Sequence, residues 1–510
     1  MTDQDIESII YKDYPKEPVA LENLSVRFMK EAKFVPLYMR EGTLYIAMAD
    51  PDDNQTINSL RFAFDFDLEI RQGRVDDILE TIERLYGAGT QSIETIIEEA
   101  DKDTFELSVN GDADVGHLID MASEAPIIRL VNRLILNAVE QRASDIHFEP
   151  FEDEFTVRYR IDGVLHEIEH PPQRLQAAIL SRVKIMSKLD ISERRLPQDG
   201  RIKLRIADRE IDFRVSTVPT LYGESLVMRI LDRENLVLDL ERLGFPEELV
   251  AEYLRLIRRP YGMFLVTGPT GSGKTSTLYT TLAKIVSSES KIITLEDPVE
   301  YQLKGVNQIQ VNPKIGLSFA HGLRAIVRQD PDIILVGEIR DRETAEIAVQ
   351  SALTGHLLFS TLHTNDSAGA ITRLLDMGVE NFLLGSTLLG ALAQRLVRVI
   401  CPHCKIRANP DEELIESMNL SPEETAHMAF YEGKGCSECH HTGFKGRIGI
   451  FEYLPINHDI RKEIMANSDS DRIKGVAIER GLVTLRRDGW KKVASGVTTI
   501  REVLRVTAEA

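Results

Sequence analysis

Residues 268–275 (GPTGSGKT) constrain the fold of this chain more than any other segment. They match the pattern G-x-x-x-x-G-K-[ST] and lie between an apolar run at residues 263–266 and a helix-like stretch at residues 276–286. Glycines let such a loop curl so that its backbone N–H groups and the start of the following helix face an anionic phosphate. The sequence therefore predicts a strand, a phosphate-binding loop and a helix that bind a nucleoside triphosphate.

The side chains of this loop have separate expected tasks. Lys274 is expected to reach the β- and γ-phosphate oxygens, and the Thr275 hydroxyl to hold Mg²⁺. A Gly/Ser turn that only joins a strand to a helix is the alternative interpretation. The residues expected to contact the nucleotide, ATP, are Gly268, Pro269, Thr270, Gly271, Ser272, Gly273, Lys274, Thr275 and Ser276.

Length, charge and hydropathy limit the class of protein. The 510 residues are enough for about three domains, and 43% hydrophobic residues suffice for several cores. The 61 basic and 81 acidic side chains give a net charge of −20, which argues against a broad duplex-binding surface. No signal peptide is expected, and the most apolar stretch, residues 382–393, is shorter than the roughly 20 residues of a membrane span. We expect a soluble protein whose association with membranes is peripheral.

Composition and pattern divide the chain into four parts. Residues 1–88 form a mixed α/β unit, and residues 89–118 form an acidic linker that is poor in apolar side chains. Residues 119–236 begin with a helical pattern and continue with alternating strands. In residues 237–510, strand-like runs alternate with helical stretches, which is typical of a wound, largely parallel α/β sheet.

Carboxylates follow two of these strand-like runs. An apolar run leads to Glu338, at the strand end where ligands bind in such sheets, and Glu338 is expected to polarise the attacking water. Gly337 stands where a metal-holding Asp is usual, so Mg²⁺ must depend on Thr275 and a second carboxylate. Glu296 and Asp297 end the preceding strand and are the candidates. For either segment alone, a helix cap is the alternative.

Histidine and arginine side chains complete the expected site. His363 closes the next strand-like run and is expected near the γ-phosphate. Phosphoryl transfer depends on charges placed around the transferring oxygens, so basic residues are candidates. They include Arg214 and Arg229 in the preceding domain, and Arg324 and Arg328, whose spacing of four predicts one helix face. For each arginine, a solvated surface position or a structural salt bridge is the alternative.

Four cysteines occur in two C-x-x-C pairs. Each pair is a turn that aims two thiolates at one point, which favours a tetrahedral, structural Zn²⁺ site. Reduced cysteines without a ligand, and a redox pair, are the alternatives. The segment between the pairs is longer than in a common zinc ribbon, so we predict an insertion spanning residues 398–447. The expected ligands are Cys401, Cys404, Cys436 and Cys439.

Several segments together resemble the secretion ATPases that power type II secretion and type IV pilus assembly. The similarity is long and specific. It covers residues 144–149 (SDIHFE), 195–201 (RLPQDGR), 268–275, 293–301 (ITLEDPVEY), 328–341, 360–366 (STLHTND) and 496–503.

The resemblance implies a RecA-like P-loop NTPase core, preceded by an N-terminal α/β domain and a PAS-like α+β domain, with a zinc-binding insertion. It implies a homo-hexamer in which the second domain closes over the nucleotide, so that Arg214 and Arg229 approach the phosphates. Roles in the site for Glu296, Glu338 and His363 are also implied. The insertion marks secretion and pilus-extension members of the family and is absent from retraction ATPases.

The resemblance also implies partners and a location. Residues 1–88 would dock on the cytoplasmic domain of an inner-membrane platform protein, and an inner-membrane assembly protein is a further partner. The chain would then be cytoplasmic and bound peripherally to the inner membrane through these proteins. No nucleic acid is expected as a partner.

We therefore expect an ATPase that forms ADP and phosphate and powers pseudopilus assembly and protein export by a type II secretion system. Type IV pilus extension is the alternative, although pilus enzymes usually have a longer N-terminal region. A DNA-handling ATPase with a zinc ribbon is disfavoured by the net charge. A scaffold that binds ATP without turnover is disfavoured by the pairing of Glu338 with Glu296.

Overall fold

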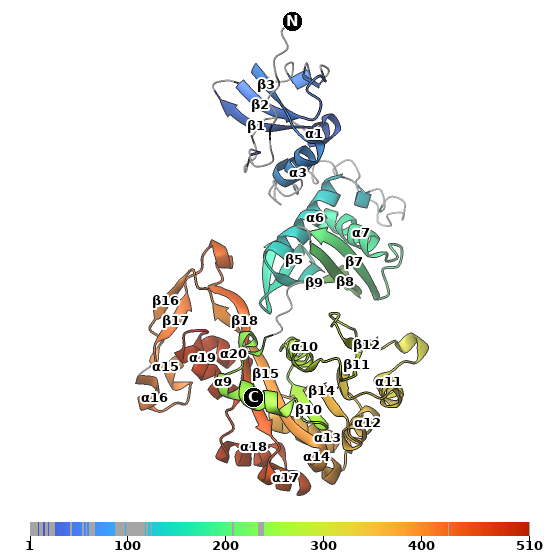
Figure 1. Ribbon diagram of the computed structural model, residues 1–510. Helices are drawn as coiled ribbons and strands as arrows, with labels where there is room; N and C mark the ends of the chain where they lie inside the picture. The colour runs from blue at the N-terminus through green and yellow to red at the C-terminus, as the bar shows by residue number, and fades with distance from the viewer. Residues whose placement is uncertain are drawn as a thin grey trace. The chain divides into compact units, whose positions relative to one another are not determined.

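The computed structural model describes residues 9, 14–15, 19, 26–40, 43–53, 56–57, 59–60, 67–86, 97, 118, 121–123, 125–206, 209–232, 239–426 and 428–508. They belong to two compact units, residues 1–231 and 232–510 (Figure 1). The predicted linker, residues 89–118, lies outside the described residues except for Ile97 and Leu118. The other domain boundaries stay predictions.

A small α/β domain begins the first unit. Its elements are α1 (Val26–Ala32), β1 (Phe34–Arg40), β2 (Thr43–Met48), β3 (Asp67–Gln72) and α3 (Val75–Tyr86). The sheet has the order β1-β2-β3, with β1 antiparallel and β3 parallel to β2. Phe34, Ile46 and Ile78 are among the fully buried side chains that form its core. The predicted α/β character of this region is confirmed.

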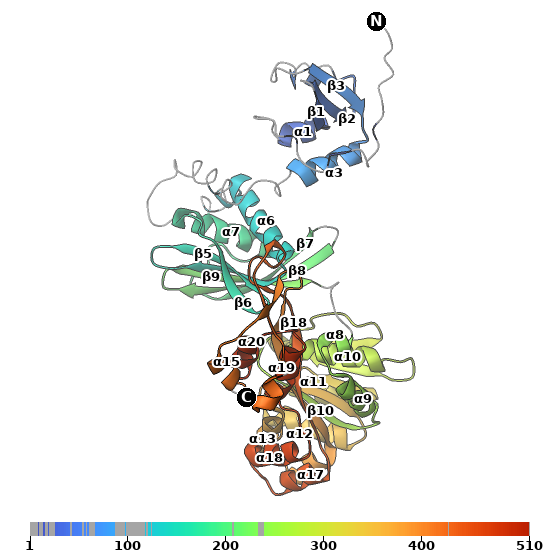
Figure 2. The same cartoon turned by 90° about the vertical axis from the view of Figure 1, so that its left-hand side faces the viewer.

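A six-stranded sheet with two main helices follows. Its elements are α6 (Ala125–Glu140), β4 (Ala143–Pro150), β5 (Phe155–Ile161), β6 (Val164–Glu169), η3 (Gln173–Leu175), α7 (Gln176–Ser187), β7 (Gln198–Ile206), β8 (Arg209–Thr220) and β9 (Gly223–Asp232). The strand order is β6-β5-β4-β9-β8-β7. Figure 2 shows α6 and α7 on one face of this sheet, where Ile146, Phe148 and Tyr159 are buried with them. The predicted α+β class is confirmed.

The second unit is built on a seven-stranded sheet. Its strands are β10 (Gly262–Thr267), β11 (Ile292–Glu296), β12 (Val306–Gln310), β13 (Ile333–Val336), β14 (Leu357–Leu362), β15 (Leu388–Ile400) and β18 (Phe444–Pro455). The order is β12-β11-β13-β14-β10-β15-β18, and every pair is parallel except β15 with β18. Strands β10, β13 and β14 are buried along their whole length, as expected for a parallel sheet with both faces covered.

Helices cover both faces of this sheet. One face packs against α8 (Leu240–Leu243), α9 (Glu247–Leu256) and α10 (Lys274–Ile285). The other face packs against α11 (Phe319–Ile326), α12 (Arg342–Leu353), α13 (Ser367–Asp376), α14 (Asn381–Thr387), α17 (His458–Met465) and α18 (Ser470–Glu479). The predicted wound α/β sheet is therefore confirmed. Because its strands are parallel, the loops at their carboxyl ends meet at one edge.

The cysteines lie in an insertion between β15 and β18. It contains β16 (Lys405–Ala408), α15 (Glu412–Glu416), α16 (Pro422–Ala426), β17 (Phe430–Gly433) and η6 (Ser437–Cys439). The chain ends with α19 (Leu485–Ala494) and α20 (Ile500–Val506). Arg398 at the base of the insertion donates to Glu502 of α20 at 2.6 Å. The insertion is therefore tied to the C-terminal helices.

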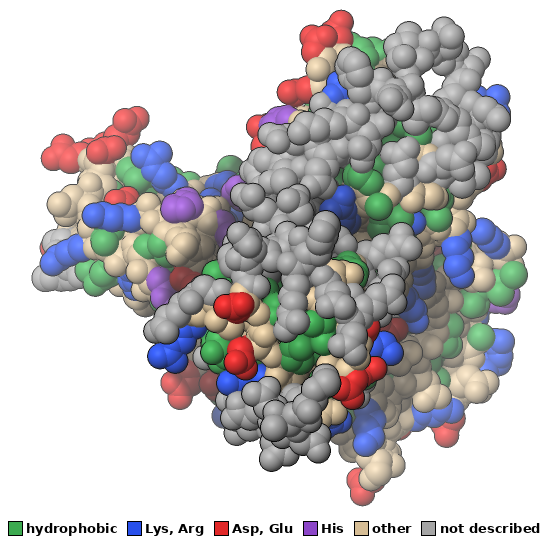
Figure 3. Space-filling model, turned by 90° about the horizontal axis from the view of Figure 1, so that it is seen from above, with side chains coloured by type: hydrophobic (Ala, Val, Ile, Leu, Met, Phe, Trp, Pro, Cys, Tyr) green, Lys and Arg blue, Asp and Glu red, His purple; other side chains and the backbone are tan. Residues whose placement is uncertain are grey.

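Two further properties of the described residues concern their helices and their surface charge. None of their helices combines the length and the apolar character that crossing a bilayer requires. On the face seen in Figure 3, Lys and Arg side chains are interspersed with Asp and Glu.

Candidate nucleotide site

The phosphate-binding loop joins β10 to α10, as the sequence predicts. Two of its glycines are required by close contacts as well as by positive φ angles. A Cβ on Gly268 (φ 149°) would lie 2.5 Å from the backbone oxygen of Gln394. A Cβ on Gly273 (φ 87°) would lie 2.8 Å from the Gln394 side-chain nitrogen. A side chain at Gly268 would push the loop away from the backbone of β15, and one at Gly273 would displace the Gln394 side chain.

Gln394 and Arg395 support the loop from β15, the strand next to β10. Gln394 is 1% exposed, and its Oε1 accepts a hydrogen bond from Thr277 Oγ1 of α10 at 2.7 Å. Arg395, which is also buried, donates to the Gln394 backbone oxygen at 3.1 Å and to the Asn365 backbone oxygen at 2.9 Å. Neither residue was predicted as part of the site. The available signal in the sequence was a Gln-Arg pair that directly follows an apolar run.

Lys274 begins α10 and reaches back over the loop. Its Nζ donates to the backbone oxygens of Gly268 at 2.8 Å and Pro269 at 3.1 Å. Burial lowers the pKa of Lys274 to about 8; Glu338 opposes this fall and Arg395 adds to it. The next residue, Thr275, is exposed at the start of the helix. Part of the Lys274 population is therefore neutral near physiological pH when no nucleotide is bound.

Glu338 lies two residues beyond β13, and its carboxylate contacts an arginine and a histidine side chain. Its carboxylate forms an ion pair with Arg340, and the other oxygen lies 3.2 Å from His363 Nε2. The Glu338 side chain is 15% exposed, so it can still contact solvent. The structure therefore brings Glu338, His363 and Lys274 to one edge of the sheet, as the sequence predicts. Their catalytic roles stay proposals.

The turn that contains His363 is anchored to β10. Thr364 donates its backbone N–H to Thr267 Oγ1 at 2.9 Å, and the two hydroxyls lie 2.7 Å apart. Asp366 then caps α13 by accepting from Gly369 N, and Lys474 of α18 donates to it at 2.9 Å. The histidine turn thus connects the loop strand to the C-terminal helices.

Glu296 and Asp297, the two candidates for a second metal-binding carboxylate, lie in different surroundings. Glu296 ends β11, is 4% exposed, and accepts hydrogen bonds from Tyr279, Thr294 and Gln308. Asp297 is exposed. Asp297 is therefore the more accessible ligand at this edge.

Arg214 and Arg229 belong to the first compact unit. Arg214 lies on β8 opposite Arg201 of β7. Arg229 lies on β9 opposite Asp145 of β4 and donates to its carboxylate at 3.0 Å. Their approach to a nucleotide therefore stays a prediction.

The predicted common helix face of Arg324 and Arg328 is wrong. Helix α11 ends at Ile326, and Arg328 lies in the following 3₁₀ turn, η5 (Val327–Gln329), where it donates to the Arg324 backbone oxygen at 2.8 Å. Asp330 has a positive φ and Pro331 follows it. The helix cannot continue through these residues, so its last turn tightens.

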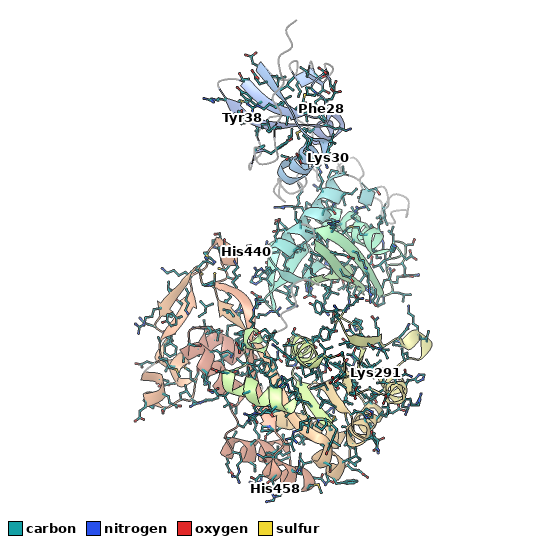
Figure 4. The ribbon with its side chains drawn as sticks, in the orientation of Figure 1. Phe28, Lys30, Tyr38, Lys291, His440 and His458 are labelled. Atoms are coloured by element: carbon teal, nitrogen blue, oxygen red, sulfur yellow. The ribbon has the colours of Figure 1, made fainter. Side chains whose placement is uncertain are left out.

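The four cysteine sulfurs form one cluster at the base of the insertion. All lie within 4.8 Å of one another, and three measured pairs are 3.7, 3.8 and 3.9 Å apart. A tetrahedral site with Zn–S bonds of about 2.3 Å has sulfur–sulfur edges of about 3.8 Å. His440, labelled in Figure 4, lies directly after Cys439 but outside this cluster. The donor set therefore fits Zn²⁺.

Comparisons with protein families agree with the geometry. Residues 120–505 match the family model of type II/IV secretion system proteins. Residues 5–92 match the model of the MshEN domain. The first match covers both the six-stranded sheet and the unit that contains the phosphate loop.

Curated relatives extend the similarity over nearly the whole chain. Type II secretion system protein E of Xanthomonas campestris pv. campestris is 51% identical to this chain, and the alignment covers 98% of this chain and 87% of the relative. The protein of the same name from Aeromonas hydrophila is 45% identical over 96% of this chain and 98% of its own. The type IV pilus assembly ATPase PilB of Myxococcus xanthus is 44% identical over 99% of this chain and 89% of its own.

Solved structures support the fold. The ATPase DotB of Legionella pneumophila superposes with a TM-score of 0.55 at 20% identity, covering 74% of this chain and 95% of its own. DotB of Yersinia pseudotuberculosis superposes with a TM-score of 0.57 at 18% identity, and the match covers 76% of this chain and 95% of DotB. The RecA-like class expected for the second unit is confirmed.

Nucleotide binding should take up a proton above about pH 8. A bound phosphate favours the protonated form of Lys274, whereas without nucleotide the pKa of Lys274 is about 8. At about pH 9 the neutral amine must therefore take up a proton when the nucleotide binds. Calorimetric titration of the full chain with Mg²⁺ and ADP, in two buffers of different ionisation enthalpy, should show uptake approaching one proton.

Lys274→Arg is the control for this measurement, because a guanidinium stays protonated throughout this range. Its binding should proceed without proton uptake. The absence of uptake by the unaltered chain at about pH 9 would contradict the assignment of Lys274.

Proposed function

The chain belongs to the type II/IV secretion system protein family, and we propose that it hydrolyses ATP to ADP and phosphate to power pseudopilus assembly and protein export by a type II secretion system. One observation supports ATP hydrolysis most strongly: the loop lysine Lys274, the solvent-accessible Glu338 and His363 meet at the carboxyl edge of one parallel sheet. The secretion role is supported by the 51% identity to a type II secretion system protein E over 98% of this chain.

The proposed mechanism assigns one task to each of these side chains. Lys274 binds the β- and γ-phosphate oxygens, and the N–H groups of the loop bind the remaining charge. Glu338 accepts a hydrogen bond from the attacking water and orients it in line with the γ-phosphate, while His363 and Arg340 hold the carboxylate in place. Thr275 and Asp297 would hold Mg²⁺, which neutralises charge on the same oxygens.

Oligomeric assembly completes the proposal. We propose a homo-hexamer, with Arg214 and Arg229 supplied to the phosphates when the second domain closes over the nucleotide. Fixed guanidinium groups stabilise charge on the transferring phosphoryl group, which is the role that such arginines have in phosphoryl transfer. Closure after binding and opening after release would convert hydrolysis into motion.

The N-terminal domain is the proposed attachment point. Residues 1–88 would dock on the cytoplasmic domain of an inner-membrane platform protein, with an inner-membrane assembly protein as a second contact. The chain would then act at the inner membrane as a peripheral protein. Its acidic composition supports protein partners over nucleic acid.

Type IV pilus extension is the second candidate function. The observation that favours it is the 44% identity to PilB over 99% of this chain. Both functions use the same chemistry at the same site, so the structure of the nucleotide site does not separate them.

Loss of the gene in its own bacterium should stop export of secreted proteins, and the unaltered gene should restore it. Glu338→Gln should fail to restore export although the purified variant binds ATP as tightly as the unaltered chain, because a neutral amide is a much weaker acceptor and base than the carboxylate that polarises the attacking water. Assays of exported protein and of ATP binding check this. Loss of pilus extension with normal export would instead support the second candidate.

We also propose that the cysteine cluster binds one structural Zn²⁺ per chain. Cys404→Ser should lower the zinc content measured by mass spectrometry, and should lower the melting temperature, because zinc binding supplies folding free energy to such small modules. His440→Ala is the control and should keep its zinc. Equal zinc contents in Cys404→Ser and the unaltered chain would count against the site.

A further inference from the structure

The Glu296 carboxylate is enclosed by hydrogen-bond donors from three elements. Its Oε1 accepts from Thr294 Oγ1 at 2.5 Å and from Gln308 Nε2 at 3.2 Å, and its Oε2 accepts from the Tyr279 hydroxyl. Three of roughly four acceptor positions are thus occupied. Glu296 is 4% exposed, so binding Mg²⁺ or water would require it to give up these bonds.

Tyr279 connects this carboxylate to the helix that carries the phosphate loop. It lies on α10, is 1% exposed, and packs edge-to-face on Tyr301 with 6.0 Å between ring centres. Tyr279 follows Thr275 by four residues, so both lie on one face of the helix, one turn apart. The contact with Glu296 therefore lies directly beneath the residue proposed to hold Mg²⁺.

The same carboxylate also organises the segment that follows β11. Gln308 donates to Glu296 and to the Tyr301 backbone oxygen at 2.8 Å, and its Oε1 accepts from Leu303 N at 2.7 Å. Burial and the hydrogen bond to Glu296 raise the pKa of Tyr279, so the hydroxyl remains a donor at all working pH values. Helix α10, β11 and β12 thus meet at one buried carboxyl group.

We infer that Tyr279 is a positioning residue of the ATPase, which holds α10 in register with β11 by its hydrogen bond to Glu296. Glu296 acts through this contact and does not touch the nucleotide. The inference rests on the proposed function. Its physical basis is that a hydrogen bond to a buried carboxylate is worth more than one between neutral groups. Loss of the bond lets the start of α10 shift slightly, which weakens the fit of Lys274 to the transferring phosphoryl group in the transition state more than it weakens the binding of ATP.

The test is Tyr279→Phe in the full chain, assayed by steady-state phosphate release. We expect a roughly tenfold lower kcat, the scale of one hydrogen bond to a charged group. The KM for ATP should change by less than about twofold, and the Mg²⁺ dependence should stay the same. Glu296→Gln should lower kcat to a similar extent, and the double variant should be no slower than the slower single variant, because the two residues act as one unit.

Tyr253→Phe is a matched control. Tyr253 is also fully buried, and its hydroxyl lies 2.6 Å from Thr281 Oγ1 on the same helix, away from the loop. Both variants lose one buried hydroxyl, but only Tyr279→Phe should lower kcat. The fluorescence of Trp490, the single tryptophan, reports whether each variant is folded.

Three outcomes would overturn the inference. The first is an unchanged kcat in Tyr279→Phe, and the second is an equal decrease of kcat in Tyr279→Phe and Tyr253→Phe. The third is a Glu296→Gln variant that requires more Mg²⁺ and whose decrease of kcat adds to that of Tyr279→Phe in the double variant. Failure of the proposed function is distinguishable, because the unaltered chain would then release no phosphate at all.

Discussion

The parallel pairing of β10 with β14 and β15 is the constraint on which the rest of the second unit depends. It brings three chain segments that are distant in sequence to one edge: the phosphate loop, the histidine turn after β14, and the Gln394-Arg395 pair of β15. The pairing register of these strands fixes where each of the three segments leaves the sheet. The position of the site therefore follows from the packing of the core beneath it.

Glu338 and Glu296 lie at the same sheet edge, and their different burial suits them to different tasks. Glu338 keeps contact with solvent and is held by Arg340 and His363, so its carboxylate can accept a hydrogen bond from water. Glu296 is closed off by neutral donors from α10, β11 and β12 and is suited to hold these elements together. In the sequence, both glutamates follow an apolar strand-like run, and it is their surroundings in the structure that distinguish them.

Local patterns predicted the parts of the site whose residues are close in sequence. The phosphate loop and the C-x-x-C turns are examples, because the chemistry of each is encoded within a few residues. Gln394 and Tyr279 could not be found in this way, since their contacts depend on which strand lies beside β10 and on how α10 packs against β11. The wrong prediction for Arg328 has a similar cause: spacing gives the face of a helix but not the residue at which the helix ends.

The account depends on ATP turnover at the edge formed by the phosphate loop, and phosphate release tests this most directly. The purified full-length chain, supplied with ATP and Mg²⁺, should release phosphate at a rate that saturates with ATP, and Lys274→Ala should release none, because no other side chain of the loop supplies a cation. Release by Lys274→Ala at the rate of the unaltered chain would contradict the account, as would an unaltered chain that binds ATP and never hydrolyses it.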